Sequence, residues 1–372
     1  MDEIFRTGTF IARVEVAGTG PCLAVIRGED VMDVTTKAAP LMRDLLELPD
    51  PVGHIRAVKG ARICSVADLM AGKIKLLAPP DLQAVKASGV TFAASMVERV
   101  IEEKAAGDAE KANEIRARVG AVIGESLRGI VPGSEAAAQV KRVLLTEGLW
   151  SQYLEVGIGP DAEIFTKCPP MAAVGHLAQV GLHPISNWNN PEPEIVLAVN
   201  SRYEIKGATL GNDVNLRDIE GRSALLLGKA KDNNASCAIG PFLRLFDETY
   251  TLDDVRTAEL TLKVTGEDGF KMVGRSLMNQ ISRDPADLVA QAGGRHHQYP
   301  DGFFLFLGTL FAPTQDRGEA GQGFTHHLND VVEISEPNLG TLQNTVRLST
   351  QAPEWTFGTA ALMRNLAGRG LL

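Results

Sequence analysis

Branched apolar residues alternate with turn-forming residues at the start of the chain. Apolar runs occupy residues 10–16 and 23–26 with a Gly-Thr-Gly-Pro turn between them, and this pattern predicts a β-hairpin. A stretch with leucines at near-helical spacing follows at residues 37–48 and ends at a proline. We therefore expect a small α+β domain over residues 1–78, closed by the two prolines that come next.

Helix-forming residues dominate the next part of the chain. Over residues 82–127 two apolar stripes flank a Gly-Asp break, and this pattern predicts a helical hairpin. A third helix is expected over residues 135–147, because a serine stands before it and a glycine follows it.

The pattern changes to strands from Leu154 onward. Residues 259–264 alternate strictly between polar and apolar side chains, a glycine-bounded turn follows, and residues 270–273 return, which predicts a second hairpin. Strands without long helices between them favour a mixed β-roll over a doubly wound parallel sheet. The predicted fold class is α+β, with the roll in a large second domain over residues 79–372.

Composition and charge narrow the range of functions. The formal net charge is -9 and the pI is about 5.4, with no basic cluster to offset it, which argues against a nucleic-acid-binding surface. The four cysteines are scattered without a CxxC pair, as in reduced cytosolic proteins. The N-terminus lacks a basic region followed by an apolar one, and no apolar run approaches the roughly 20 residues that span a bilayer. We expect a soluble, cytoplasmic protein that binds neither nucleic acid nor membrane.

Two glutamates one residue apart precede the apolar run 195–199. On a strand, Glu192 and Glu194 project from the same face, and side-by-side carboxylates require a cation. Mg²⁺, or alternatively Mn²⁺, prefers carboxylate oxygens and suits this set better than zinc. Asp213 is the candidate third ligand, because a turn-like Gly-Asn pair before it can bring a second strand back to the first. The alternative is the solvated face of an edge strand with no ion.

A lysine follows the short apolar run 224–228. We expect Lys231 at the inner end of a strand beside the ion, where a desolvated lysine is shifted towards its neutral, proton-accepting form. Strand alternation would place Lys229 on the same face. An ordinary surface lysine is the alternative.

Several segments resemble, in order and spacing, the core of the fumarylacetoacetate hydrolase superfamily. They are Glu192-Pro193-Glu194, Gly211-Asn212-Asp213-Val214 with Arg217-Asp218, Lys231 followed by Gly240-Pro241-Phe242, and residues 163–170, 308–309 and 339–344. The resemblance covers roughly residues 79 to 346. It implies a mixed β-roll catalytic domain, Mg²⁺ on Glu192, Glu194 and Asp213, catalysis by Lys231 and not Lys229, and a homodimer or homotetramer.

Two departures from the parent hydrolases bear on the reaction. Glu163 stands where they have an aspartate ligand, which is similar to the branch of 2-keto-3-deoxy sugar acid dehydratases. Ser95 stands where many hydrolases have the histidine that activates water, although Glu98 is kept three residues on. Without that base, elimination of water from the substrate is favoured over hydrolysis. The alternatives are a salt-bridged Glu163, and Ser95 and Glu98 as ordinary helix residues.

Three further residues are candidates for contact with the substrate. The resemblance implies that Thr309 contacts the 2-keto acid and assigns Arg217 to the substrate. His297 lies on a glycine-flanked loop that could hold the distal carboxylate or hydroxyls.

The resemblance therefore implies a Mg²⁺-dependent hydro-lyase of pentose degradation, which converts a 2-keto-3-deoxypentonate to 2,5-dioxopentanoate. Lys231 or a glutamate would remove a C3 proton, and Glu98 or Glu163 would protonate the leaving C4 hydroxyl. The alternatives are a metal-dependent C–C hydrolase of acylpyruvates or 2,4-diketo acids, and a non-catalytic role in an assembly.

Overall fold

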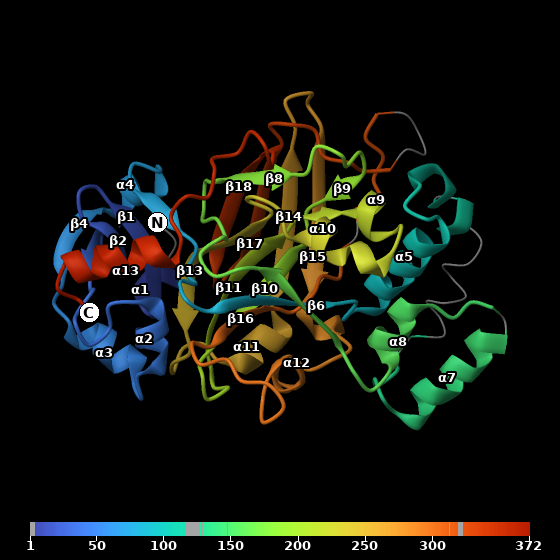
Figure 1. Cartoon of the computed structure of the whole chain (residues 1–372), viewed down its shortest axis with the longest axis horizontal. Coiled ribbons are helices and arrows are strands. Elements are labelled where there is room, and N and C mark those ends of the chain that lie inside the picture. The colour runs from blue at the N-terminus through green and yellow to red at the C-terminus, as the bar shows by residue number, and fades with distance from the viewer. Residues whose placement is uncertain are drawn as a thin grey trace.

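The computed structural model describes residues 4–112, 114–116, 127, 129–146, 148–311, 313–318 and 323–372. One long mixed sheet runs from the N-terminal unit into the centre of the molecule (Figure 1). Its strands lie side by side in the order β4, β3, β2, β1, β13, β11, β10, β16, β6, β7, with β5 beside β1. Their bounds are β1 Phe10–Val16, β2 Gly20–Arg27, β3 Asp30–Asp33, β4 Ala61–Ser65, β5 Lys75–Leu77, β6 Ala84–Gly89, β7 Glu163–Cys168, β10 Pro193–Val199, β11 Ile205–Asp213, β13 Cys237–Leu245 and β16 Phe303–Phe306.

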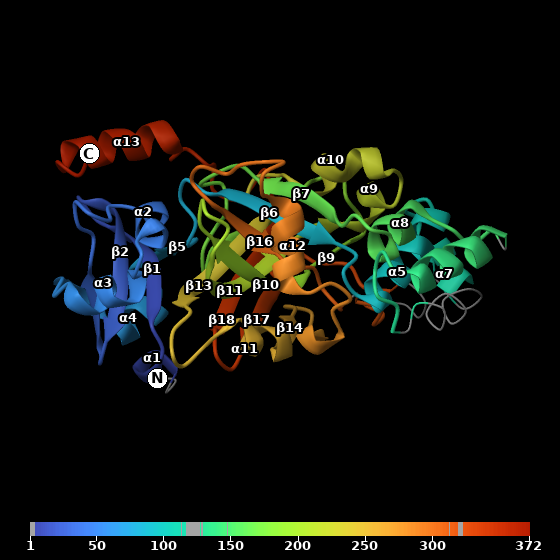
Figure 2. The same cartoon turned by 90° about the horizontal axis from the view of Figure 1, so that it is seen from below.

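The N-terminal unit is joined to the rest of the molecule through this sheet. The predicted first hairpin is confirmed as the antiparallel pair β1 and β2, and β1 also pairs with β13. The C-terminal helix α13 (Thr359–Gly368) lies beside this unit (Figure 2), where Asn365 Nδ2 donates to the Thr19 carbonyl at 2.8 Å. The unit predicted over residues 1–78 therefore shares its sheet with the second domain and is covered by the end of the chain.

A second sheet packs against the central strands and carries the other predicted hairpin. Its order is β15, β14, β17, β18, β8, and β14 pairs antiparallel with β15 as the alternation of residues 259–264 predicts. A small two-stranded sheet joins β9 to β12. The bounds are β8 Gln179–Leu182, β9 Asn189–Asn190, β12 Asn215–Leu216, β14 Glu259–Thr265, β15 Lys271–Leu277, β17 Val331–Glu336 and β18 Gly340–Leu348.

The central strand β10 is buried on both faces. Ile195 and Leu197 belong to the core between the two sheets, whereas Val196 and Ala198 belong to the core on the opposite face. Apolar residues are needed on both faces of such a strand, which explains the uninterrupted run in the sequence. Gly211 lies opposite on β11, where a Cβ would overlap Phe306 and the Val196 side chain. The Gly-Asn pair before Asp213 is thus part of a strand, and its interpretation as a turn is wrong.

Helices surround the far end of the sheet. The predicted third helix is confirmed as α7 (Glu135–Thr146), beside α5 (Ala93–Lys104) and α8 (Gln152–Ile158). The predicted helical hairpin is wrong at its start, because residues 84–89 form β6, which pairs with β16 and β7. Its second apolar stripe lies mostly at 117–126, outside the described residues.

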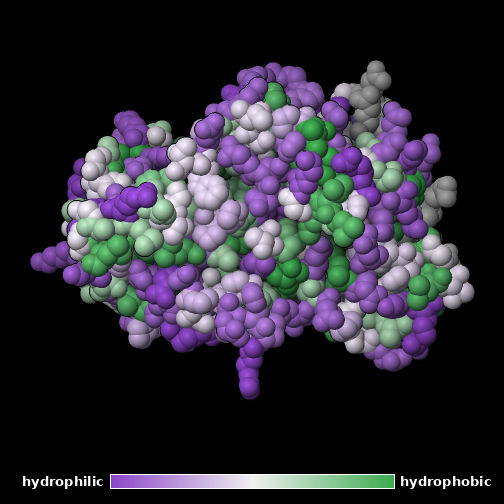
Figure 3. All heavy atoms as spheres, in the orientation of Figure 1, coloured by the Kyte–Doolittle hydropathy of each residue, from purple (hydrophilic) through white to green (hydrophobic). Residues whose placement is uncertain are grey.

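The remaining helices are short. They are α1 Ile4–Thr7, α2 Met42–Glu47, α3 Pro51–Ala57, α4 Val66–Met70, α9 Arg217–Glu220, η1 Ala224–Leu226, α10 Leu227–Lys231, α11 Leu252–Thr257, η2 Met278–Gln280 and α12 Pro285–Ala292. Nothing in the described part of the chain is a helix long and apolar enough to cross a membrane. The surface in Figure 3 is largely hydrophilic, with an apolar stripe over the region of α9 and α10, where Leu225 is 96% exposed. The fold class is α+β, as predicted.

Candidate active site

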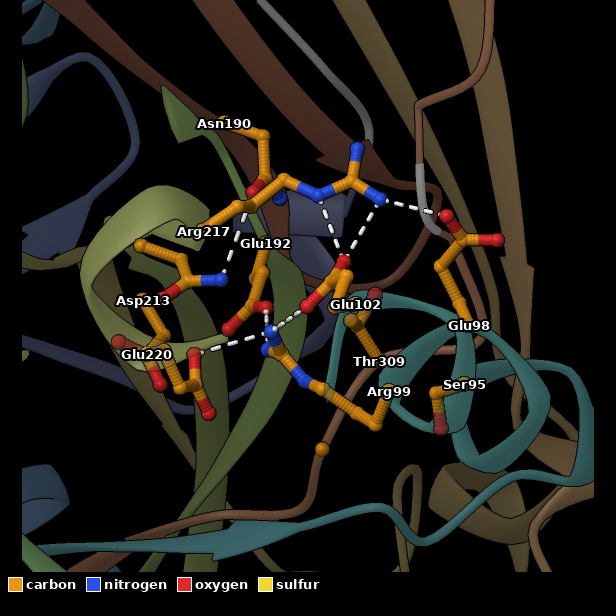
Figure 4. A network of polar contacts seen from close by, with 12 residues as sticks. Ser95, Glu98, Arg99, Glu102, Asn190, Glu192, Asp213, Arg217, Glu220 and Thr309 are labelled. Carbon is orange, nitrogen blue, oxygen red and sulfur yellow. Dashed lines mark hydrogen bonds and ion pairs between the residues drawn. The ribbon is translucent and has the colours of Figure 1, made fainter. Parts of the chain in front are cut away.

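Three carboxylates meet where β10 begins and β11 ends. Glu192 and Glu194 lie at the start of β10, and the antiparallel partner β11 ends at Asp213, whose backbone N–H donates to the Glu192 carbonyl at 3.1 Å. One oxygen from each of the three carboxylates lies within 4.8 Å of the others, and all three residues are buried. Figure 4 shows this group beside side chains from α5. Strand pairing therefore brings together the three predicted metal ligands.

Two buried lysines and an arginine contact these carboxylates. Lys231 Nζ lies 2.5 Å from Glu192 Oε2 and 3.0 Å from Asp213 Oδ2. Lys167 Nζ lies 2.7 Å from Asp213 Oδ1, and Arg99 Nη2 lies 2.6 Å from Glu192 Oε1. Lys167 and Arg99 were not predicted as site residues. Lys167 lies within the matched segment 163–170, and Arg99 directly follows Glu98, so both positions carried a signal.

Lys231 reaches the site from a helix and not from a strand. It ends α10, where it is buried while Lys229 is exposed, so the predicted strand at this position is wrong. Burial lowers the pKa of Lys231, but the nearby carboxylates of Asp213, Glu192 and Glu220 raise it more, and the net shift is upward. This is opposite to the neutral lysine expected from the sequence, because three acids face the ammonium group.

Glu194 is held by the backbone of a neighbouring strand end. Its Oε2 accepts a hydrogen bond from the Gly308 N–H at 2.6 Å. Burial, together with the charges of Asp213 and Glu192, raises the pKa of Glu194 well above its usual value. The site therefore holds negative charge that its lysines and arginine do not fully balance.

Gly308 has a backbone that other residues adopt only with strain. Its φ is +89°, and a Cβ there would overlap Thr91 Oγ1. We expect Gly308→Ala to destabilise the protein by about 1–3 kcal/mol and to weaken divalent-cation binding, since the N–H that orients Glu194 would move. Thermal melting with and without Mg²⁺ measures both effects. Gly269→Ala is the matched control, because its φ is +84° and nothing lies within 4 Å of its Cβ position. Equal melting temperatures and equal Mg²⁺ responses in the two variants would contradict the prediction.

Glu163 is a buried carboxylate at the start of β7. It lies opposite Gly89 on β6, and a Cβ on that glycine would overlap the Glu163 carboxylate. No hydrogen bond or ion pair to this carboxylate is found among the described residues. Burial raises the pKa of Glu163, although the positive charges of Arg99 and Lys231 partly oppose this effect. A carboxyl group of this kind is suited to proton transfer.

Helix α5 contributes a network of ion pairs to the cavity wall (Figure 4). Arg217 Nε donates to Glu102 Oε1 and its Nη2 donates to Glu98 Oε1, both at 2.6 Å. Its Nη1 donates to the Pro313 carbonyl at 3.0 Å. Glu98 also accepts hydrogen bonds from Arg116. The predicted substrate contact of Arg217 does not fit this arrangement, because each of its terminal nitrogens already has a protein partner.

Arg99 links the same helix to the metal-ligand group. Besides Glu192, it lies 2.7 Å from Glu102 and 2.9 Å from Glu220. Burial raises the pKa of Glu220 to about 7, although Arg99 and Lys231 partly oppose the rise. Helix α5 is thus connected to the carboxylates of β10 and α9 through one guanidinium group.

The other predicted contact residues differ in their positions. Ser95 lines the cavity, but its Oγ donates to the Phe92 carbonyl at 2.8 Å and accepts from the Phe92 N–H at 3.3 Å, as a helix cap. Thr309 also lines the cavity, and its Oγ1 accepts from the Phe311 N–H at 3.2 Å. His297 is exposed on the loop after α12 and is not among the lining residues, so its predicted contact with substrate does not fit the structure.

The donor set fits a hard divalent cation. The candidate ligands are all carboxylate oxygens, which Mg²⁺ and Mn²⁺ prefer. The raised pKa of Glu194 points the same way, because it reflects repulsion that a bound cation would remove. Glu192, Glu194 and Asp213 would hold the ion.

Two curated relatives match about half of the chain. A 2-dehydro-3-deoxy-D-arabinonate dehydratase from Saccharolobus solfataricus is 33% identical over 188 residues, which are 50% of this chain and 58% of the relative. A protein from Haloferax volcanii named "Probable 2-keto-3-deoxyxylonate dehydratase" is 32% identical over 197 residues, which are 52% of this chain and 63% of the relative. The matches thus span less than two thirds of either relative.

The fold is shared more widely. A solved structure of 2-keto-3-deoxy-D-arabinonate dehydratase, complexed with magnesium and 2,5-dioxopentanoate, superposes with a TM-score of 0.65 at 22% identity and covers 91% of this chain and 99% of that one. The family model described as fumarylacetoacetate hydrolase, C-terminal, matches residues 156–347, just over half of the chain. The chain therefore belongs to the fumarylacetoacetate hydrolase family.

Proposed function

We propose that the chain is a Mg²⁺-dependent hydro-lyase that dehydrates a 2-keto-3-deoxypentonate to 2,5-dioxopentanoate, a step of pentose degradation. The observation that carries this proposal is the combination of three clustered carboxylates with Glu163, a buried carboxyl group without a protein partner among the described residues, in one cavity. The names of the two relatives and the magnesium complex of the solved structure support the same reaction.

Glu192, Glu194 and Asp213 would hold the ion, which when bound supplies Lewis acidity that makes the C3 protons next to the keto group easier to remove. Lys231 holds Glu192 and Asp213 in place and provides positive charge where negative charge develops on the substrate. Thr309 remains the candidate contact to the 2-keto acid.

Glu163 is the proposed proton carrier. It would take a proton from C3 and deliver one to the C4 hydroxyl, so that water leaves and the carboxyl group returns to its starting state. Glu98 is a poorer donor, because its oxygens already accept hydrogen bonds from Arg116 and Arg217. Dehydration first gives an enol, and its tautomerisation yields the product.

Hydrolysis of acylpyruvates is the alternative reaction on this fold. It needs a base that activates water near the position of Ser95. The Ser95 hydroxyl is instead occupied by the backbone of Phe92, which favours elimination.

The test is turnover of both enantiomers of a 2-keto-3-deoxypentonate with Mg²⁺, followed by an assay for the semialdehyde. We expect Glu163→Gln to lower kcat/KM by about 100-fold or more, because an amide cannot carry the proton. Glu259→Gln, at an exposed position on β14, is the control and is expected to retain activity. Pyruvate release from a 2,4-diketo acid without semialdehyde formation from either enantiomer would refute the proposed dehydration.

A further inference from the structure

Every basic side chain that lines the cavity is already engaged by acidic partners. Arg99 contacts Glu192, Glu102 and Glu220, Arg217 contacts Glu98 and Glu102, and Lys231 contacts Glu192 and Asp213. A ligand can therefore place one anionic group on the bound cation, but a second carboxylate or a phosphate would find no unengaged basic group along the described lining. Such a group would face the carboxylates of α5 instead. The cavity is suited to an acid whose remaining groups are neutral.

Two neutral polar groups line the same cavity without a protein partner. Ser88 is 3% exposed and Asn215 is fully buried. Neither Ser88 Oγ nor Asn215 Oδ1 has a hydrogen-bond partner among the described residues. A buried polar atom without a partner is destabilising, so such atoms in a cavity indicate a ligand that supplies the missing hydrogen bond.

The orientation of the Asn215 amide follows from its neighbours. Asn190 Nδ2 donates to the Pro191 carbonyl at 3.0 Å, and a carbonyl can only accept, which identifies Asn190 Oδ1 as its other terminus. That oxygen is 3.5 Å from Asn215 Nδ2, so the terminus of Asn215 without a partner is its oxygen. An amide oxygen accepts a hydrogen bond from a hydroxyl group and is repelled by a carboxylate.

The two groups lie on opposite sides of the reaction centre. Ser88 precedes Gly89, which lies against Glu163, whereas Asn215 follows Asp213 by two residues and so projects from the same face of the chain. We propose that Ser88 and Asn215 are specificity-determining residues that hydrogen-bond hydroxyl groups of the substrate beyond its 2-keto acid head. This inference rests on the proposed function and adds that the substrate tail is hydroxylated, uncharged and unphosphorylated.

The experiment compares two five-carbon 2-keto acids that differ only in their hydroxyl groups. KM for 2-keto-3-deoxypentonate and the inhibition constant of 2-oxopentanoate are measured with Mg²⁺ in the wild type, Ser88→Ala and Asn215→Ala. In each variant we expect the preference for the hydroxylated acid to fall by about threefold to tenfold, the typical net contribution of one hydrogen bond. The inhibition constant of 2-oxopentanoate is expected to stay within about twofold, because this ligand makes neither contact.

Thermal melting separates this role from a structural one. Ser88→Ala removes a buried hydroxyl without a partner, so the free variant is expected to melt at the same temperature as the wild type or higher. Thr209→Val is the matched control. Thr209 Oγ1 is also buried on β11 and without a partner among the described residues, but it does not line the cavity, and the preference between the acids should not change.

An unchanged preference in both variants would overturn the inference, as would an equal weakening of both acids. If the wild type does not turn over the hydroxylated acid, the proposed function fails. The same preference is then taken from dissociation constants measured by calorimetry. Tighter binding of 2-oxopentanoate than of the hydroxylated acid by the wild type would then overturn the inference, and loss of the hydroxyl preference in the variants would support it.

Discussion

Lys231→Ala is expected to abolish turnover of 2-keto-3-deoxypentonate, whereas Lys229→Ala is expected to leave most of it. Lys231 is buried and pairs with Glu192 and Asp213, so its removal leaves two buried carboxylates without their lysine partner. It also removes a positive charge from the place where negative charge develops on the substrate. Loss of one such group lowers kcat by about 100-fold or more. Lys229 is exposed on the same helix and is the matched control.

Folding has to be checked beside activity in this experiment. Breaking a buried ion pair by removing one partner costs about 3–5 kcal/mol, so the melting temperature of Lys231→Ala is expected to fall. Lys231→Met keeps most of the side-chain volume without the charge, and a folded but inactive Lys231→Met would assign the effect to the charge. An active Lys231→Met, or an inactive Lys229→Ala, would show that the wrong lysine has been placed in the site.

These two lysines show what local patterns do not predict. The apolar run 224–228 is too short for its periodicity to distinguish a strand from a helix. On a strand Lys229 and Lys231 would share a face, whereas on a helix residues two apart lie about 200° apart around the axis. The helix α10 therefore separates them physically, one buried and one exposed. The choice of Lys231 came from the spacing of the matched segments and not from the predicted secondary structure.

Elements with a clear local period were predictable, and elements defined by distant partners were not. The alternation of residues 259–264 is enough to predict β14, because one face of that strand is buried and the other is exposed. Residues 84–89 contain helix-forming alanines and a lysine but form β6, because β16 and β7 pair with them from more than 70 residues away along the chain. Intrinsic helix propensity is weak beside such tertiary pairing.

The candidate site follows the same division. Glu192 and Glu194 are adjacent on one strand, so their common face was predictable from alternation alone. Arg99 and Lys167 become site residues only because α5 and β7 pack against β10 and β11 in three dimensions. The helical spacing of Glu98 and Glu102 with Arg99 was a usable signal, since residues three and four apart share a face of a helix.

Removal of divalent cations is expected to abolish activity, and Mg²⁺ or Mn²⁺ is expected to restore it. Three buried carboxylates within 4.8 Å of one another repel strongly, and the upward pKa shift of Glu194 shows that the neighbouring lysines do not cancel this repulsion. A cation bound there stabilises the folded protein in proportion to its saturation, by about 2.7 kcal/mol at a hundred times its dissociation constant. The melting temperature of the wild type should therefore rise with added Mg²⁺.

Glu194→Gln tests whether this response comes from the predicted site. The variant removes one ligand charge and is expected to lose both turnover and most of the Mg²⁺-dependent rise in melting temperature. Glu336→Gln is the matched control, because Glu336 is also a buried glutamate whose pKa is raised by burial, but it lies at the end of β17 and does not line the cavity. It should retain the Mg²⁺ response. Full turnover in excess EDTA, or an undiminished Mg²⁺ response in Glu194→Gln, would mean that these carboxylates serve the fold and not a cation.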